Sequence, residues 1–223
     1  MRKITVAIDG PAGAGKSSAA KIAAKRLHYL YIDTGAMYRA FTWALLERQL
    51  SIADEEKVAA LVETVSIRLE AGEERCRVFV DAREVTKEIR SYDVSAHVST
   101  VAALAVVRRK LVQLQREMAA GGGVILDGRD IGTVVLPQAD LKLYLTASVA
   151  SRARRRWLEV QAAGGTETLA DIAANIAARD QLDSEREISP LRRADDAVLL
   201  DNSELTLDET ADMICRLIEA RAR

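Results

Sequence analysis

A glycine-rich segment near the start of the chain has the composition and spacing of a phosphate cradle. Gly10–Ser17 fits the pattern G-x-x-x-x-G-K-[S/T] and lies between an apolar run and a helical pattern. Glycines let backbone N–H groups converge on phosphate oxygens, the lysine adds a compact positive charge, and the serine hydroxyl can bind Mg²⁺. The start of the helix adds the positive end of its dipole. The residues expected to bind the nucleotide phosphates are Gly10, Pro11, Ala12, Gly13, Ala14, Gly15, Lys16, Ser17 and Ser18.

Two further polar clusters directly follow apolar runs. Asp33–Arg39 follows the second run and Asp127–Asp130 follows the third. Wound α/β sheets bind ligands at the carboxyl ends of their strands. Taken alone, Asp33 is as readily a helix cap, and Asp127 with its glycine as readily a turn. Beside a phosphate cradle they favour a binding site, in which Asp33 and Asp127 could orient Mg²⁺ through water.

Two groups of arginines mark the second half of the chain. Arg152, Arg155 and Arg156 share one turn of a predicted helix, and Arg179, Asp183 and Arg186 fall on one face of the next. A solvated charged face is the usual explanation for a single arginine. Together with Arg154, however, four arginines occupy five positions and repel one another unless an anion is present. We therefore expect phosphate near them.

The elements that would position these residues alternate between strand and helix, which predicts a wound α/β sheet. The runs are nearly all apolar, as in strands covered on both faces. The expected strands are Ile4–Ile8, Tyr29–Ile32, Val124–Leu126, Leu141–Leu145 and Ala197–Leu200. The expected helices are Lys16–Leu27, Ala36–Leu50, Val94–Ala119, Ser151–Ala163, Leu169–Arg186 and Leu207–Arg221.

One region interrupts this alternation. Between Ser66 and Arg90 apolar residues recur at every second position around a turn at Gly72, with arginines such as Arg75 on the other side. This pattern is typical of a half-exposed antiparallel pair of strands. We predict an inserted subdomain beside the main sheet.

The composition of the chain limits the classes of partner. The chain has 223 residues, of which 29% are charged, and its 32 basic and 33 acidic side chains nearly cancel. Cys76 and Cys215 form no metal-binding spacing and no disulfide framework, and no apolar stretch is long enough to span a membrane. We expect a cytoplasmic monomer that binds small-molecule nucleotides, with neither nucleic acid nor a membrane as partner.

These motifs together resemble bacterial cytidylate kinase, within the nucleoside monophosphate kinase group. The matching segments run along nearly the whole chain: IDGPAGAGKSS, IDTGAMYRA, KEIRSYDVS, LDGRDIGTVV and ARDQLDSEREISPL. The resemblance implies transfer of the γ-phosphoryl group of ATP to CMP or dCMP, with Mg²⁺. It also implies a P-loop kinase fold, a five-stranded parallel sheet flanked by helices with an antiparallel monophosphate-binding insert and a short helical lid. The implied single domain 1–223 has a core of 1–60, 100–150 and 190–223, an insert of about 61–99 and a lid of about 151–167.

The resemblance also implies roles for individual residues. Ser17 would bind Mg²⁺ directly. The implied CMP-binding residues are Thr34, Tyr38, Arg39, Ser99, Arg108, Arg129, Asp130, Arg179, Asp183 and Arg186. The implied catalytic residues are Lys16, Arg39, Arg129, Arg152, Arg156 and Arg186, with Arg155 in the same lid as Arg152 and Arg156. Thr34 stands where the family often has serine, which keeps the hydroxyl.

One implied pair constrains the local geometry. Ser99 and Arg108 are nine residues apart, so a straight helix would place them on opposite faces. If both contact one cytosine, the helix must break or kink near 103–107.

The residue types also bear on the mechanism. The attacking oxygen of a monophosphate is already anionic, so the reaction needs no general base, and we expect His28 and His97 to be structural or solvent-facing. Repulsion between two anionic substrates is the main obstacle, and Lys16, Mg²⁺ and the arginines would offset it.

Other functions remain open from the residues alone. UMP, AMP, dTMP or a hydroxy acid such as shikimate could be the acceptor, with Asp33 as base for a hydroxyl. A nucleotide-dependent switch would need an effector surface, and the chain has no N-K-x-D base-reading sequence. RNA binding would need aromatic platforms, whereas only 4% of the residues are aromatic.

Overall fold

A computed structural model describes residues 2–70 and 76–223 of the chain. The chain divides into two compact units, Met1–Tyr31 with Ala119–Arg223 (unit 1) and Ile32–Met118 (unit 2). None of the helices in the described residues is both long and apolar enough to cross a membrane.

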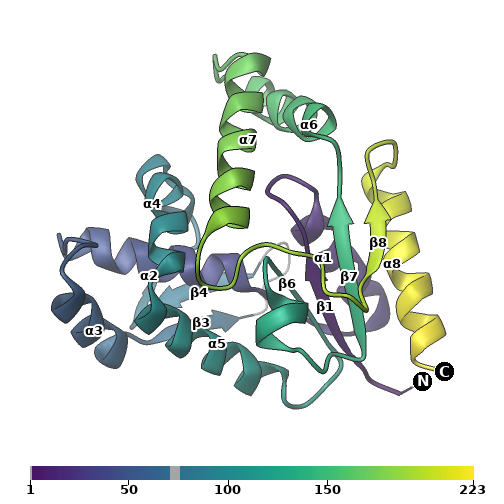
Figure 1. Cartoon of the computed structure of the whole chain (residues 1–223), viewed down its shortest axis with the longest axis horizontal. Coiled ribbons are helices and arrows are strands. Elements are labelled where there is room, and N and C mark those ends of the chain that lie inside the picture. The colour runs from purple at the N-terminus through teal and green to yellow at the C-terminus, as the bar shows by residue number, and fades with distance from the viewer. Residues whose placement is uncertain (1, 71–75) are drawn as a thin grey trace. The chain divides into compact units, whose positions relative to one another are not determined.

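Unit 1 contains most of a five-stranded parallel sheet with the strand order β2-β6-β1-β7-β8 (Figure 1). The strands are β1 (Thr5–Asp9), β2 (Leu30–Asp33), β6 (Val124–Gly128), β7 (Leu141–Thr146) and β8 (Val198–Asp201). In the centre of the sheet, Asp9 of β1 lies level with Gly128 of β6 and Tyr144 of β7. The carboxyl ends of these strands therefore form one edge, at which the Gly10 and Asp127 motifs begin. All five strands were predicted within one residue at their first position.

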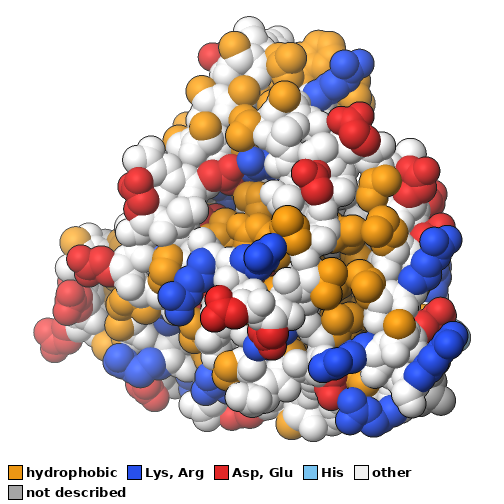
Figure 2. Space-filling view, turned by 45° about the vertical axis from the view of Figure 1, so that its right-hand side comes forward, with side chains coloured by type: hydrophobic (Ala, Val, Ile, Leu, Met, Phe, Trp, Pro, Cys, Tyr) orange, Lys and Arg blue, Asp and Glu red, His pale blue; other side chains and the backbone are white. Residues whose placement is uncertain are grey.

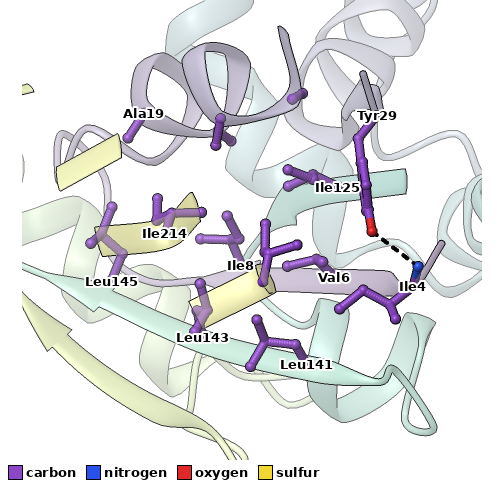
Figure 3. Close-up of a cluster of buried hydrophobic side chains, with 14 of the residues drawn as sticks. Ile4, Val6, Ile8, Ala19, Tyr29, Ile125, Leu141, Leu143, Leu145 and Ile214 are labelled. Atoms are coloured by element: carbon purple, nitrogen blue, oxygen red, sulfur yellow. Dashed lines mark hydrogen bonds between the residues drawn. The ribbon is translucent and has the colours of Figure 1, made fainter. Parts of the chain in front are cut away.

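Helices flank this sheet and close its core. They are α1 (Lys16–Leu27), α6 (Val149–Ala162), α7 (Leu169–Glu185) and α8 (Leu207–Arg221). α1 packs against α8, and α6 packs against α7. Strand residues such as Ile8, Ile125 and Leu143 meet alanines of α1 and Ile214 of α8 in one buried cluster (Figure 3). Small alanines on α1 let that helix lie close to the strands.

Unit 2 carries the antiparallel sheet predicted from the sequence, and this sheet is separate from the parallel one. Its strands are β3 (Ile67–Glu70), β4 (Arg77–Val80) and β5 (Arg83–Glu84), in that order. Val78 and Val80 are buried opposite Leu69 and Ile67, whereas Arg77 is exposed. The period-two prediction is therefore confirmed for the described strands, while the expected turn at Gly72 and the position of Arg75 lie outside the described residues.

Helices make up the rest of unit 2. They are α2 (Thr34–Glu47), α3 (Glu55–Thr64), the 3₁₀ turn η1 (Glu88–Arg90), α4 (Tyr92–Ala103) and α5 (Ala105–Ala119). The sequence analysis missed α3, although Asp54 caps it and Val58, Leu61 and Val62 have helical spacing on its buried side. The expected single helix Val94–Ala119 was wrong, because Leu104 adopts an extended conformation and divides it into α4 and α5.

Charged side chains of both signs alternate over the face of the molecule drawn in Figure 2, with apolar side chains between them. This mixture agrees with the near balance of 32 basic and 33 acidic residues. On that face, positive potential must therefore arise from local arrangements of side chains rather than from one large basic patch.

Candidate active site

The phosphate cradle has the backbone conformation that its glycines predict. Gly10 has a φ of 148°, and a Cβ at this position would lie 1.9 Å from the carbonyl oxygen of Leu145, so only glycine fits. Gly15, with a φ of 82°, precedes α1 without a side-chain cap. Helices α2, α3, α4, α6, α7 and α8 each have a side chain that accepts from their first turn. The first N–H groups of α1 are therefore available to an anion.

Lys16 is buried at the centre of this cradle. Its Nζ donates to the carbonyl oxygen of Pro11 at 2.8 Å. Burial lowers the pKa of the Lys16 ammonium well below its ordinary value, and the positive charge of Arg129 acts in the same direction. A phosphate at the cradle would favour the charged ammonium, so binding an anion here would draw in a proton.

Ser17 and Asp127 lie in direct contact at the same edge of the sheet. Ser17 Oγ donates to Asp127 Oδ2 at 2.8 Å, and the hydroxyl of Tyr31 donates to Asp127 Oδ1 at 2.6 Å. Asp127 is the fourth residue of the buried strand β6 and is itself buried. The alternative interpretation that Asp127 belongs to a turn is therefore wrong, because Asp127 lies near the end of strand β6 and its carboxylate contacts Ser17 of the cradle.

Hydroxyl and carboxylate oxygens are the donors that Mg²⁺ prefers, so Ser17 and Asp127 fit that ion. Within 2–70 and 76–223, no group of three or more His, Cys, Asp or Glu side chains could hold a metal. One direct ligand, Ser17 Oγ, with Asp127 acting through water, would leave most positions of a six-coordinate ion open to other ligands. Water and the phosphates of a nucleotide would have to complete its coordination, which is how Mg²⁺ usually binds in kinases.

Asp9, the last residue of β1, was not selected from the sequence. Its carboxylate accepts from the N–H groups of Ile131 and Gly132, each at 2.7 Å. Burial raises the pKa of Asp9 to about 6, against the opposing effect of these two hydrogen bonds. The two donors begin the π-helical turn η2 (Ile131–Val135), directly after Arg129 and Asp130. Asp9 thus joins the start of the phosphate cradle to the D-G-R-D motif.

The arginines of α6 have three different environments. Arg152 is buried, donates to the carbonyl oxygens of Ala147 and Ala12 at 2.9 Å each, and pairs with Asp180 at 2.6 Å. Arg156 is largely exposed and pairs with Glu159 of its own helix at 3.0 Å.

Arg155 donates to the backbone of the segment after β8. Its acceptors include the carbonyl oxygens of Asn202 and, at 3.2 Å, Leu205. The expected repulsion is therefore reduced within the protein itself, because Arg152 and Arg156 have carboxylate partners and Arg155 has carbonyl acceptors. Their implied catalytic and lid roles stay predictions.

A second charged group forms around the end of α7. Arg129 Nε donates to Asp183 Oδ2 at 2.7 Å, and Arg186 Nη2 lies 3.7 Å from Asp130 Oδ1, an ion pair too long for a hydrogen bond. Arg179 Nε is buried without a hydrogen-bond partner. Burial lowers the pKa of Arg179, and the charge of Arg129 adds to this effect.

Arg129, Arg179 and Asp183 lie close enough for their charges to interact, and their roles at a phosphate and ribose site stay predictions. The expected shared helix face was only partly correct. α7 ends at Glu185, and Arg186 is extended at its C-terminus. The buried Nε of Arg179 could donate to a phosphate or hydroxyl oxygen of a ligand.

The remaining expected CMP-binding residues lie in unit 2, as does Asp33, which was expected to act on Mg²⁺ through water. Asp33 caps α2 by accepting from the N–H of Ala36 at 2.9 Å, and Thr34 is the first residue of that helix. Arg39, one turn further, donates to Ser95 Oγ of α4 at 2.9 Å. The helix-cap interpretation of Asp33 is thus confirmed, and its water-mediated contact with Mg²⁺ stays a prediction.

The break at Leu104 meets the geometric condition set by Ser99 and Arg108. Ser99 is in α4 and Arg108 in α5, so they no longer share a straight helix. Arg108 is buried, donates to the carbonyl oxygen of Ala102 at 3.2 Å, and lies 5.7 Å from the ring centroid of Tyr38. The structure therefore brings together Tyr38 and Arg108, two of the residues expected to bind CMP.

Both histidines have the structural or solvent-facing positions expected from the sequence. His28 ends α1 in a left-handed conformation, and His97 is exposed with its ring bonded to the carbonyl of Asp93. Cys76 and Cys215 are both partly buried, and the Cys76 thiol lies 3.6 Å from the carbonyl oxygen of Arg77. Asn202, which was missed, donates to the carbonyl of Ala14 at 3.0 Å; it directly follows β8, so the rule that ligands lie at strand ends could have found it.

Comparisons with known proteins agree with this arrangement. A family model described as cytidylate kinase matches residues 6–220. A cytidylate kinase of Exiguobacterium sibiricum is 51% identical over 219 residues, which cover 98% of each chain. One from Desulfitobacterium hafniense is 50% identical over 216 residues, 97% of this chain and 93% of that protein.

The fold also matches a solved structure. An uncharacterised protein from Eubacterium ventriosum superposes with a TM-score of 0.53 and 11% identity, over 98% of this chain and 99% of that one. At that identity the likeness concerns the fold alone. The family model and the relatives cover nearly all of this chain, and the chain therefore belongs to the cytidylate kinase family.

Proposed function

We propose that the protein transfers the γ-phosphoryl group of ATP to CMP, and to dCMP, giving ADP and CDP or dCDP. One observation carries the proposal: a complete phosphate cradle, with Lys16 buried in it and Ser17 on Asp127, occurs in a chain of this family. We choose CMP as the acceptor because the two relatives are named cytidylate kinase.

In this reaction an anionic oxygen of the CMP phosphate attacks the γ-phosphorus of ATP. The bond from that phosphorus to the bridging oxygen breaks, and ADP leaves with the negative charge. The cradle of Gly10–Ser17 would hold the donor phosphates through backbone N–H groups and Lys16 Nζ. Since the acceptor is already ionised, no side chain has to remove a proton.

The arginines would bring two anions together. Arg129 and Arg186 lie beside Asp183 and Asp130, where their positions are set before a ligand arrives. Arg179 offers a buried Nε without a partner. Arg39, Tyr38 and Arg108 of unit 2 would hold the CMP phosphate and base.

Ser17 would bind Mg²⁺ through its hydroxyl, with Asp33 and Asp127 acting through water. When bound, Mg²⁺ neutralises charge that develops on the phosphate oxygens. Among the arginines of α6, Arg152 is placed beside the cradle by its bond to Ala12, while Arg156 is exposed and would have to move to reach the phosphates.

An acceptor panel tests the proposal directly. ADP release would be measured with ATP and Mg²⁺ and with CMP, dCMP, UMP, AMP, dTMP or shikimate in turn. We expect the highest kcat/KM with CMP or dCMP. A higher value with any other acceptor would reject the substrate, and ADP release at the same rate without an acceptor would reject phosphoryl transfer.

The remaining expectations concern the cell and the assembly. We propose that the protein acts in the cytoplasm as a monomer. The two cysteines, which lie far apart in sequence and form no disulfide framework, are consistent with a reducing compartment. Light scattering at micromolar concentration would give the mass: 24.4 kDa for a monomer, and twice that for a dimer.

A further inference from the structure

Tyr31, in β2, contacts Asp127, the carboxylate that also accepts from Ser17. Tyr31 has no role in the proposed function. The carboxylate of Asp127 accepts from two hydroxyl groups, one at each oxygen: Ser17 at Oδ2 (2.8 Å) and Tyr31 at Oδ1 (2.6 Å). Asp127 is only 4% exposed. Both hydrogen bonds are therefore made inside the protein, where they are stronger than in water.

The position of the Tyr31 ring is fixed by its surroundings. Tyr31 belongs to β2 and packs against the hydrophobic cluster between the sheet and α1. The Nζ of Lys21, on α1, lies 5.7 Å from the centroid of the ring. A strand residue held on one side by the core has little freedom to move its hydroxyl, so the hydrogen bond to Asp127 is set by the fold.

We propose that Tyr31 is a positioning residue that holds Asp127 so that Ser17 can bind a divalent cation. The terminal torsion of an aspartate is soft, and one bond to each oxygen is what defines its plane. With its proton directed to Asp127 Oδ2, the Ser17 hydroxyl has its lone pairs left for the cation. Tyr31, by occupying Oδ1, keeps Oδ2 toward Ser17.

The proposal rests on the proposed function, because the cation is the one that accompanies ATP. Its prediction concerns the affinity for the cation, whereas the proposed function concerns phosphoryl transfer. Groups that orient a metal ligand without touching the metal typically change affinity 10–100-fold when removed. Loss of the Tyr31 hydroxyl should therefore weaken the metal and leave the metal-free cradle unchanged.

The test compares Tyr31→Phe with Tyr29→Phe. Tyr29 is two residues earlier; its hydroxyl accepts from the N–H of Ile4 at 3.2 Å and has no bond to the cradle (Figure 3). Each variant loses one hydroxyl group and keeps its ring. ADP binding would be measured by calorimetry, without CMP, at a series of Mg²⁺ concentrations and in EDTA.

We expect the Mg²⁺ concentration that half-saturates the effect on ADP binding to rise about 10-fold in Tyr31→Phe. Tyr29→Phe should match the wild type, and all three proteins should bind ADP equally in EDTA. A change below twofold in Tyr31→Phe, or an equal loss of ADP affinity with and without Mg²⁺, would overturn the proposal.

A double-mutant cycle guards against a folding defect in the single variant. In an Asp127→Asn background, Tyr31→Phe should cause no further change in the Mg²⁺ requirement, because its partner carboxylate is already lost. Full additivity would overturn the proposal. Failure of the proposed function is a separate result: the wild type itself would then show no Mg²⁺-dependent binding of ADP.

Discussion

Five arginines expected at the site make different kinds of contact in the two units. In unit 1, three arginines of the site each pair with a carboxylate: Arg129 with Asp183, Arg152 with Asp180 and Arg186 with Asp130. In unit 2, Arg39 donates to the hydroxyl of Ser95 and Arg108 donates to the carbonyl oxygen of Ala102. Ion pairs thus contribute to the positions of these three arginines in unit 1, and hydrogen bonds to neutral oxygens contribute to the positions of the two in unit 2.

The kind of contact determines how much stability is lost when the partner of an arginine is removed. Removing a carboxylate from a buried ion pair leaves a charge without its counter-ion, which is strongly destabilising. Removing a neutral acceptor loses one ordinary hydrogen bond, about 1 kcal/mol. Unit 1 should therefore respond to substitutions of acidic partners mainly in stability, and unit 2 mainly in substrate binding.

Lys16 breaks the comparison most clearly, because it lies in unit 1 but is held by a carbonyl, that of Pro11. Among the described residues no carboxylate lies within ion-pair distance of its Nζ, and a bound phosphate would favour the charged ammonium. Lys16→Ala should lower kcat about 10³-fold, as for other groups that stabilise transition-state charge. The measurement is steady-state turnover of ATP and CMP, with circular dichroism to show that the fold is kept.

Lys25→Ala is the matched control, since Lys25 is exposed near the end of the same helix. It should leave kcat within twofold of the wild type. Near-normal turnover of a folded Lys16→Ala protein would reject the role given to the cradle.

Asp9 gives the converse case, a buried carboxylate bonded to backbone N–H groups rather than to a guanidinium. Its pKa is raised from 3.8 to about 6. A raised pKa means that the stability it contributes is fully present below about pH 4 and is lost as pH rises through 6. The two pKa values differ by about two units, so the loss amounts to about 3 kcal/mol.

The measurement is urea unfolding of the wild type and of Asp9→Asn between pH 4 and 7.5. Asparagine does not titrate, so the difference in unfolding free energy should shift in favour of Asp9→Asn as pH rises. A difference that is constant across this range would show that Asp9 has the same pKa in the folded and unfolded chain.

Asp180→Asn tests the ion-paired side of the comparison. Arg152 is buried, with a side chain 5% exposed, so its lost counter-ion is not replaced by water. We expect a loss of about 2 kcal/mol in unfolding free energy, below the usual range for a fully buried pair because Asp180 is 23% exposed. Glu159→Gln, which removes the exposed partner of Arg156, should cost less than about 0.5 kcal/mol. Equal effects of the two substitutions would contradict the assumed importance of burial.

Much of the fold could be predicted because strand, helix and cradle are local patterns. The apolar runs gave all five strands of the parallel sheet, and the period of two gave the separate antiparallel one. The local sequence does not indicate that a helix ends at Leu104, because Val94–Ala119 contains neither Gly nor Pro. The break was inferred only from the condition that Ser99 and Arg108 both contact one cytosine.

The site was predicted less completely, because its partners are far apart in the chain. Asp180 and Arg152 are on two helices, and only the packing of α6 on α7 brings them together. Tyr31 looked like an ordinary apolar strand residue, and its hydroxyl matters only because Asp127 lies on a neighbouring strand. An oxygen that packing brings to an arginine from a distant part of the chain cannot be recognised from the sequence. That is why the repulsion expected among the arginines of α6 was overestimated.

The smallest expected effect comes from the neutral side of the comparison. Ser95→Ala removes the hydroxyl that holds Arg39 at 2.9 Å, while the guanidinium keeps its charge and its longer contact with the carbonyl of Ile89 at 3.5 Å. A loss of about 1 kcal/mol in positioning corresponds to a rise of about fivefold in the KM for CMP, with the KM for ATP unchanged. Ser95→Thr keeps the hydroxyl and should restore the KM for CMP. A change in the KM for ATP instead would mean that Ser95 supports the donor side, and the division between the two units would then be wrong.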